Sequence, residues 1–339
     1  MELKDIKLTP LIDTIQLLKI SDEEYFSPKY NNYISNSRLG LINPNQGGSP
    51  ESFFKGFDGS GYNQSFELGS AVHELILQPE YFELAPALNK PTAKLGAMAD
   101  ELYSIWLNRP VTNSDIEKAS NKIDYYKGKL NENIIQNLRE KCTPYWKARK
   151  KHKESSDKIT IYLDNKSLDT VTNCVQALTS NKDIQNLLHP EGLLEEPLSI
   201  NENAILMDVL VNCPNGKEIT LHLKSKLDNF TIDLETDTIV INDVKTIGKI
   251  VSEIDNNAVK YHYYRELAMY LYLLKLYVTK EYKIENPKLF ANYLVVSTIP
   301  QYYTKVKPLI NKDIARGMKE FSTLLRYVAY QMCYNNMSF

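Results

Sequence analysis

The chain contains the stretch EITLHLKSKLDNF at residues 218–230, followed after a turn by TIVINDVKTIGK at 238–249 and by YHYYRELAMYLYLLKLY at 261–277. The first two segments alternate apolar and polar side chains, which is typical of half-buried strands, and the third is expected to form a helix. Two strands followed by a helix therefore form the unit around which we expect an α/β fold to be organised.

The two predicted strands carry acidic residues, Asp228 in the first and Asp243 in the second. Because side chains alternate along a strand, Asp243 and Lys245 share one face while Val244 points the other way. A face with Asp-x-Lys beside a second Asp is a poor hydrophobic core. Carboxylate oxygens suit Mg²⁺, and a nearby lysine can orient or deprotonate a metal-bound water. The residues alone thus predict a divalent-metal site on a sheet.

The composition is that of an ordinary globular protein. The 339 residues are enough for one large domain or two small ones, with 43% hydrophobic and 24% charged residues. The formal net charge of −2 shows no global basicity. A nuclease remains compatible with this charge, because a local basic track can contact phosphates while an acidic site holds metal.

The four cysteines, Cys142, Cys174, Cys213 and Cys333, form no CxxC pair. We therefore expect reduced thiols in a cytoplasmic protein, and neither zinc nor an iron–sulfur cluster. The opening segment MELKDIKLTPLIDTIQLL lacks the apolar core of a signal peptide, and no segment is long enough to span a membrane. A soluble protein with no membrane partner is expected.

The apolar patterns predict a central mixed sheet flanked by helices within a single domain, residues 1–339. Its expected parts are an N-terminal helical and loop region (1–66), a helical insertion (85–190), the catalytic sheet and helix (195–300) and a C-terminal helix (311–339).

Within these parts, helices are expected near Leu11–Leu18, at 66–84 and at 251–280, and a buried strand is expected at 288–298. From Asn311 onward, apolar residues recur at alternating steps of four and three, which predicts an amphipathic helix. Core packing is the simplest role of this stripe, with an oligomer contact as the alternative. The stripe consists of Ile314, Met318, Phe321, Leu325, Val328 and Met332.

Two polar features allow both a structural and a functional interpretation. Ser35 and Ser37 precede an apolar run, which is typical of a helix N-cap, and substrate contact is the alternative. His73 lies on the predicted helix 66–84 one turn after Gly69, where the helix could approach another backbone closely. On its own, His73 is more typical of a hydrogen-bonded core histidine than of a metal ligand.

The segment KARKKHK (147–153) carries five positive charges in seven residues. Such a run usually forms a solvated helix face, but Tyr145 and Trp146 precede it and leave room for phosphate tracking or base stacking. Two further lysines share the face of Asp228 by alternation and would lie nearer the site. The candidate DNA-binding residues are Lys147, Arg149, Lys150, Lys151, Lys153, Lys224 and Lys226.

Asp-x-Lys or Glu-x-Lys occurs five times in this chain, so the motif is weak by itself. Asp164 with Lys166 follows the strand-like run KITIYL and is the main rival of Asp243 with Lys245. The rival has no acidic companion across a hairpin, and a helix starts directly after Lys166. Asp243 has Asp228 on the strand before it, a helix after it and a histidine-bearing helix upstream, which favours it as the site.

The order of four motifs resembles the PD-(D/E)XK nuclease superfamily, most closely its RecB/RecE-type branch, which includes phage recombination exonucleases. The motifs are G-x-x-x-H, K-x-K-x-D, D-V-K-T and E-x-x-x-Y. They lie in LGSAVHELILQPEYF, LKSKLDNF, VINDVKTIGK and YYRELAMYLYLL, and NKDIQNLLHPEGLLEEPLSI is a further matching segment. The matches span residues 68–274. The resemblance implies a PD-(D/E)XK (restriction-endonuclease-like) core.

The resemblance also implies roles for single residues. His73 and the Val244 carbonyl match positions that touch metal, while Glu266 and Tyr270 fall where the family carries Gln-x-x-x-Tyr. Two departures matter: Lys226 replaces an arginine and loses its bidentate fork, and Glu266 adds a negative charge in place of glutamine. The implied metal ligands are His73, Asp228, Asp243 and Val244, and the implied catalytic residues are Asp228, Asp243, Lys245, Glu266 and Tyr270.

By the same resemblance, the expected activity is that of a Mg²⁺-dependent DNA exonuclease in recombination or repair of a phage or mobile element, with Mn²⁺ as a substitute. Lys245 would help generate the attacking hydroxide, and metal would polarise the scissile phosphate. A site-specific or structure-specific endonuclease is one alternative. A non-catalytic DNA-binding subunit is another, which Lys226 and Glu266 favour. The implied partners, in the cytoplasm of a bacterial host, are linear duplex DNA ends, a single-strand annealing protein and further copies of the chain in a homo-oligomer.

Overall fold

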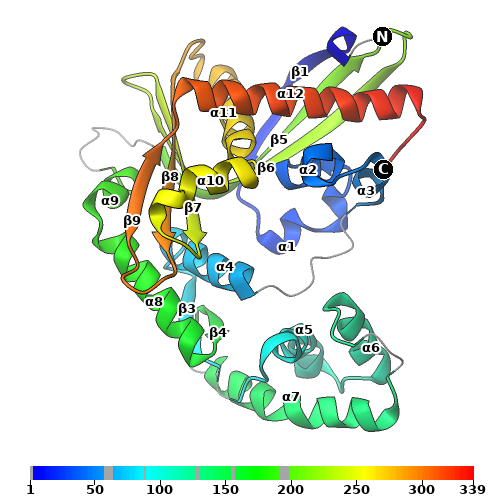
Figure 1. Cartoon of the computed structure of the whole chain (residues 1–339), viewed down its shortest axis with the longest axis vertical. Coiled ribbons are helices and arrows are strands. Elements are labelled where there is room, and N and C mark those ends of the chain that lie inside the picture. Colours follow the sequence, from blue (N-terminus) through cyan, green and yellow to red (C-terminus); the bar gives the residue numbers. More distant parts are fainter. Residues whose placement is uncertain (1–2, 57–63, 88, 127–129, 154–156, 191–197) are drawn as a thin grey trace. The chain divides into compact units, whose positions relative to one another are not determined.

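The computed structural model describes residues 3–56, 64–87, 89–126, 130–153, 157–190 and 198–339. The chain folds into two compact units (Figure 1), of which the first combines residues 1–57 with 177–339 and the second comprises 58–176. The predicted histidine helix therefore belongs to the second unit, while the two predicted strands and the helix after them belong to the first.

The first unit is built on a mixed sheet whose described part contains seven strands. Its members are β1 (Lys7–Leu18), β2 (Tyr33–Ile34), β5 (Leu198–Asn212), β6 (Glu218–Asp233), β7 (Thr238–Ile247), β8 (Lys288–Ser297) and β9 (Thr304–Pro308). Six of them follow the spatial order β1, β5, β6, β7, β8, β9, and β2 pairs with β6. Neighbours are antiparallel except for the parallel pairs β7–β8 and β2–β6. The parallel pair β7–β8 requires a long crossover, which the helices between these strands provide.

Helices cover both faces of this sheet. α11 and α12 pack their apolar residues into the core cluster on one face. On the other face, the Leu187 carbonyl of α9 accepts a hydrogen bond of 3.0 Å from Asn242 Nδ2 of β7. The expected mixed sheet flanked by helices is therefore confirmed. The described helices of this unit are α1 (Asp22–Tyr25), α2 (Asn36–Ile42), α3 (Pro50–Lys55), α9 (Lys182–Leu188), α10 (Ile254–Lys260), α11 (Tyr263–Tyr282), α12 (Asn311–Tyr334) and the 3₁₀ turns η1 (Leu3–Asp5), η2 (Pro28–Tyr30), η3 (Pro44–Gln46) and η4 (Val251–Glu253).

Several expected elements are confirmed. The C-terminal helix is α12, and Phe321, Leu325 and Val328 of its stripe are buried in the core. The strand expected at 288–298 is β8. Ser35 is the N-cap of α2, because its hydroxyl accepts a hydrogen bond of 3.2 Å from the Arg38 N–H.

Two expected helices of the first unit are wrong in kind or extent. Residues 11–18 form part of β1, because antiparallel pairing with β5 overrides the local helical pattern. The helix expected over 251–280 is divided into α10 and α11. The division falls at Tyr261 and His262, where His262 adopts a left-handed conformation with φ 58°.

The expectation of four reduced thiols is also wrong. Cys213, directly after β5, forms a disulfide with Cys333 of α12. These residues are 120 positions apart, so no sequence spacing could have paired them. Cys142 and Cys174 are buried thiols, and burial raises the pKa of each to about 12.

Gly317 marks a close approach between α12 and α11. A Cβ built on Gly317 would lie 2.0 Å from the carbonyl oxygen of Tyr264, so one backbone would have to shift. We expect Gly317→Ala to destabilise the first unit by about 1–3 kcal/mol, seen as a lower urea midpoint at unchanged slope. Gly248→Ala is the control, because the nearest atom to its Cβ would be 4.0 Å away. An equal loss in both variants would contradict the close approach.

The second unit is mostly helical, as expected for residues 85–190. Tyr145 and Trp146, expected beside a stacking surface, are instead buried in its core, where Trp146 Nε1 donates to the Ala99 carbonyl at 2.8 Å. No helix within the described ranges of the chain is long and apolar enough to cross a membrane. The elements of this unit are α4 (Gln64–Leu77), β3 (Phe82–Pro86), α5 (Ala93–Asn108), α6 (Asn113–Lys122), α7 (Glu132–Lys153), β4 (Ile159–Leu163) and α8 (Asn165–Ser180), which ends in the first unit.

Candidate functional site

The acidic residues of the two central strands lie where β6 and β7 part. These strands pair only from Asn229 opposite Asn242 to Asp233 opposite Thr238. Asp228 and Asp243 are the next residues beyond this ladder. The Val244 N–H donates a hydrogen bond of 2.8 Å to Asp228 Oδ2. The carboxylate thus takes the place of a backbone acceptor and holds the two strand ends together.

Four of the predicted site residues form one connected cluster in the first unit. Lys245 Nζ lies 2.7 Å from Asp243 Oδ2 and 3.1 Å from Glu266 Oε2. Tyr270 OH donates to Glu266 Oε1 at 3.3 Å, one helical turn further along α11. Strand β7 and helix α11 therefore hold the lysine between two carboxylates. Glu266 serves as the second partner of Lys245.

Burial dominates the electrostatics of this cluster. It raises the pKa of Asp228 to about 7, with Lys245 opposing and Glu202 adding to the shift. It raises the pKa of Asp243 to about 8, against the opposing effect of Lys245 and with the help of Asp228. Burial alone would lower the pKa of Lys245, but Asp243, Glu266 and Asp228 raise it well above its ordinary value. A protonated lysine therefore faces these carboxyl groups. A further cation would stabilise the ionised form of each carboxyl group.

Glu202 of β5 is a functional candidate that the sequence reasoning missed. It lies opposite Asp228, between the pairs Asn201–Asn229 and Asn203–Leu227, and adopts a positive φ of 55°. Carboxylate oxygens of Glu202 and Asp228 lie within 4.8 Å of each other. The available signal was the run of three polar residues, Asn201, Glu202 and Asn203, within a strand-like segment.

A row of asparagines lies on the opposite face of the sheet, next to the acidic residues in sequence. Asn229 Nδ2 donates to Asn201 Oδ1 at 2.8 Å, and Asn242 Nδ2 donates to Asn229 Oδ1 at 2.8 Å. Asn292 Nδ2 continues the row by donating to Asn242 Oδ1 at 2.9 Å. Because buried amides need partners, this row fixes the register of β5 to β8 directly behind the site.

The acidic groups of the first unit fit a hard divalent cation. Asp228, Asp243 and Glu202 offer carboxylate oxygens, the donors that Mg²⁺ and Mn²⁺ prefer. Asp243 Oδ2 is buried and lies 2.7 Å from Lys245 Nζ, and this ion pair occupies one of its lone pairs. An oxygen with unused lone pairs in a buried acidic cluster is what a cation site requires.

Other predicted site residues lie in the second unit. His73 is on α4, and its role as a metal ligand stays a prediction. Lys147, Lys150 and Lys151 are exposed on α7, whereas Arg149 packs on the Tyr103 ring at 4.1 Å and pairs with an aspartate. The side chain of Lys153 lies outside the described part of the structure. The phosphate contacts of this segment stay a prediction.

Lys224 and Lys226 are engaged by protein groups. Lys224 is 8% exposed, lies over the Tyr25 ring at 4.4 Å and donates to the Tyr25 carbonyl at 2.8 Å. Lys226 Nζ pairs with Glu202 Oε2 at 2.6 Å and with Asp22. These placements do not favour phosphate contact by either lysine. Lys226 instead neutralises Glu202 beside Asp228, a task for which the fork of an arginine is not needed.

The rival Asp164 has a structural task. Its Oδ1 accepts from the backbone N–H groups of Lys166 and Ser167 at 3.0 and 3.1 Å, and its Oδ2 accepts from the Ser167 hydroxyl at 2.7 Å. Burial would raise the pKa of Asp164, but these hydrogen bonds outweigh it and lower the pKa. Asp164 therefore caps the start of α8.

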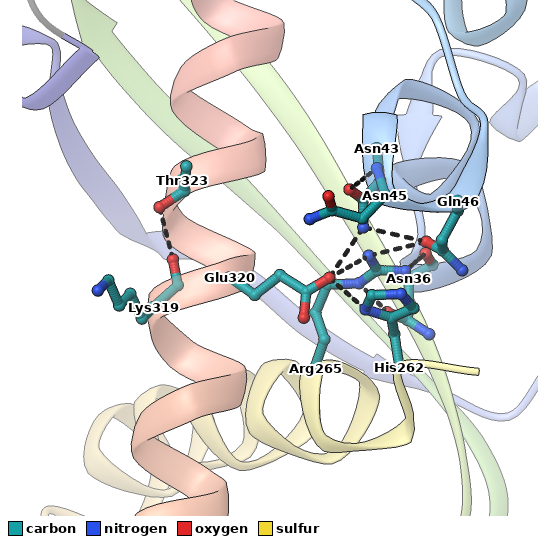
Figure 2. Close-up of polar contacts among 9 residues, drawn as sticks. All are labelled: Asn36, Asn43, Asn45, Gln46, His262, Arg265, Lys319, Glu320 and Thr323. Atoms are coloured by element: carbon teal, nitrogen blue, oxygen red, sulfur yellow. Dashed lines mark hydrogen bonds and ion pairs between the residues drawn. The ribbon is translucent and has the colours of Figure 1, made fainter. Parts of the chain in front are cut away.

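A buried ion cluster anchors the first turn of α11, which also carries Glu266 (Figure 2). Arg265 Nη1 lies 3.0 Å from Glu320 Oε1 of α12, and Arg265 Nε donates to Asn36 Oδ1 at 2.7 Å. His262 Nδ1 is 2.5 Å from the same Glu320 oxygen. Arg265 is 1% exposed, so this cluster fixes α11 against α2 and α12 from the interior.

Comparisons with known proteins add little to this description. No protein-family model matches the chain, and no curated protein sequence matches it. One similar solved structure is named "Putative exonuclease" from Eubacterium rectale; it is 9% identical, covers 92% of this chain and 86% of its own, and has a TM-score of 0.46. A likeness at this level defines no family. The fold and the site define a mixed α/β protein with a buried acidic centre that contains a lysine.

Proposed function

We propose that this chain is a metal-dependent deoxyribonuclease, specifically a Mg²⁺-dependent exonuclease of the PD-(D/E)XK type that acts on linear duplex ends in recombination or repair. The observation that carries the proposal is the cluster of Asp228, Asp243, Lys245 and Glu266 at the point where β6 and β7 part. Metal-assisted phosphodiester hydrolysis needs acidic groups that bind a cation and a positively charged group beside the reacting phosphate. The acids of this cluster and the buried Lys245 fit these two roles.

In this proposal the residues divide the work. The divalent cation would be held by Asp228, Asp243 and Glu202, and it would supply polarisation of the phosphate and activation of water. Lys245 is protonated in the arrangement seen and has three N–H donors. Its two carboxylate partners therefore leave a donor for the attacking water or a phosphate oxygen. Tyr270 keeps Glu266 turned toward Lys245, which positions the lysine.

The metal requirement is tested by removing it. We expect degradation of end-labelled linear duplex with Mg²⁺ or Mn²⁺, no cleavage in excess chelator, and none with Ca²⁺, which prefers longer bonds and looser geometry. Closed circular duplex under the same conditions is the control. Nicking of circles would indicate an endonuclease, and binding of DNA without cleavage would indicate a non-catalytic subunit. Full activity in chelator would contradict the metal mechanism.

A further inference from the structure

We propose that Tyr261 is a stacking platform for an unpaired base of the DNA strand that the acidic centre cleaves. This inference rests on the proposed nuclease function and names a part of its substrate: a strand end whose last bases are not paired. It adds a binding position for that end between α10 and α11, outside the acidic cluster.

Two tyrosine rings connect the protein surface with the lysine of the site. Tyr261 is 48% exposed, and its ring is stacked on that of Tyr263, with centroids 5.7 Å apart and planes inclined by 27°. The Tyr263 ring in turn lies 4.7 Å from Lys245 Nζ. Stacked bases are spaced about 3.4 Å apart, so a base on Tyr261 belongs to a nucleotide close to the phosphate held at Lys245.

The stack depends on an unusual backbone conformation. In a continuous helix, residues two apart do not face each other. Here His262 separates α10 from α11 with φ 58°, a left-handed conformation that residues with a Cβ rarely adopt. Glu320 Oε1 holds the His262 ring at 2.5 Å and also binds the buried Arg265 (Figure 2). The ion cluster secures this strained turn, and the turn presents an aromatic ring beside the site. Strained backbone held in place by its surroundings is typical of functional sites.

The chemistry of the surface around Tyr261 suits a single strand. Aromatic faces stack with every base, so such a platform is independent of sequence. Lys260 Nζ lies 4.9 Å from the Tyr261 ring centre. Because exposed cation–π contacts are weak, Lys260 can exchange the ring for the phosphate next to the stacked base. A base inside a duplex has both faces covered by its neighbours, which is why the occupant is an unpaired base.

The test measures binding in Ca²⁺, where cleavage is not expected, by fluorescence anisotropy of labelled duplexes that carry a short single-stranded overhang of either polarity. We expect Tyr261→Ala to weaken binding of at least one overhang by about 5- to 150-fold, the range found for the loss of one stacked base. Tyr261→Phe keeps the ring and is expected to bind as wild type. An abasic overhang is expected to weaken wild-type binding similarly and to leave Tyr261→Ala unaffected.

Tyr303→Ala is the matched control, because Tyr303 is 63% exposed in the same unit and is not part of this stack. It is expected to bind as wild type. The platform is overturned if wild type binds overhangs with and without bases equally well, or if Tyr261→Ala, Tyr261→Phe and wild type bind alike. Cleavage of linear duplex by the wild type in Mg²⁺ distinguishes failure of the platform from failure of the nuclease function. If the wild type cleaves, a negative binding result overturns only the platform. If it does not cleave, the proposed nuclease function is overturned as well.

Discussion

Asp243→Asn is expected to reduce Mg²⁺-dependent cleavage of linear DNA by about 10³-fold or more, with the protein still folded. Asparagine preserves the shape of the side chain but removes the charge that a cation would bind. Asp243 Oδ2 is buried 2.7 Å from Lys245 Nζ, so the substitution also deprives the lysine of its nearest partner. The measurement is single-turnover cleavage of end-labelled duplex, with circular dichroism to verify folding.

Asp164→Asn is the matched control for this loss. Asp164 also lies in an Asp-x-Lys motif after a strand, but its carboxylate caps α8. Asparagine caps helices about as well as aspartate, so both activity and stability should change little. The reverse outcome, with activity lost in Asp164→Asn and kept in Asp243→Asn, would show that the active site is at Asp164 and not at Asp243.

Arg265→Met is expected to destabilise the first unit by about 3–5 kcal/mol, because it leaves the carboxylate of Glu320 without its buried cationic partner. The contact of 3.0 Å between Arg265 Nη1 and Glu320 Oε1 is almost fully shielded from water on the arginine side. Denaturant unfolding, followed by the fluorescence of the tyrosines in this unit, measures the change in free energy. Since the same turn of α11 carries Glu266, cleavage should fall as well.

Two variants separate the loss of the ion cluster from a general effect of removing a charge. Lys29→Ala breaks an exposed pair with Glu24 and is expected to cost less than about 1 kcal/mol. The double variant Arg265→Met with Glu320→Leu removes both charges of this pair and should recover part of the stability lost in Arg265→Met. A cost for Arg265→Met as small as that for Lys29→Ala would show that the cluster does not anchor α11.

Local pattern was enough to predict the central elements. Alternation predicted that Asp243 and Lys245 share a face, and the structure has their side chains in contact. The apolar stripe from Asn311 predicted α12, because periodicity over many residues is a strong signal. The same reasoning failed at residues 11–18, where a short segment was decided by its pairing with β5 rather than by its own preference.

The surroundings of the site needed the tertiary structure. Glu202 lies on β5, and only the pairing of β5 with β6 brings it opposite Asp228. Lys224 and Lys226 were expected to meet phosphate, since alternation gives the face of a side chain but not its partners. Their partners, Tyr25 and Asp22, lie 199 and 204 residues earlier in the chain. Such contacts depend on how segments far apart in the sequence pack together, which no local pattern encodes.

Periodicity and residue type within one continuous stretch were enough to predict the two acidic strands, a helix after them and the shared face of Asp243 and Lys245. The tertiary structure alone decided that Glu266 pairs with Lys245, that Cys213 is bonded to Cys333, and that His262 bends the chain between α10 and α11. Each of these depends on a distance or a backbone angle that is settled only when segments far apart in the sequence pack together.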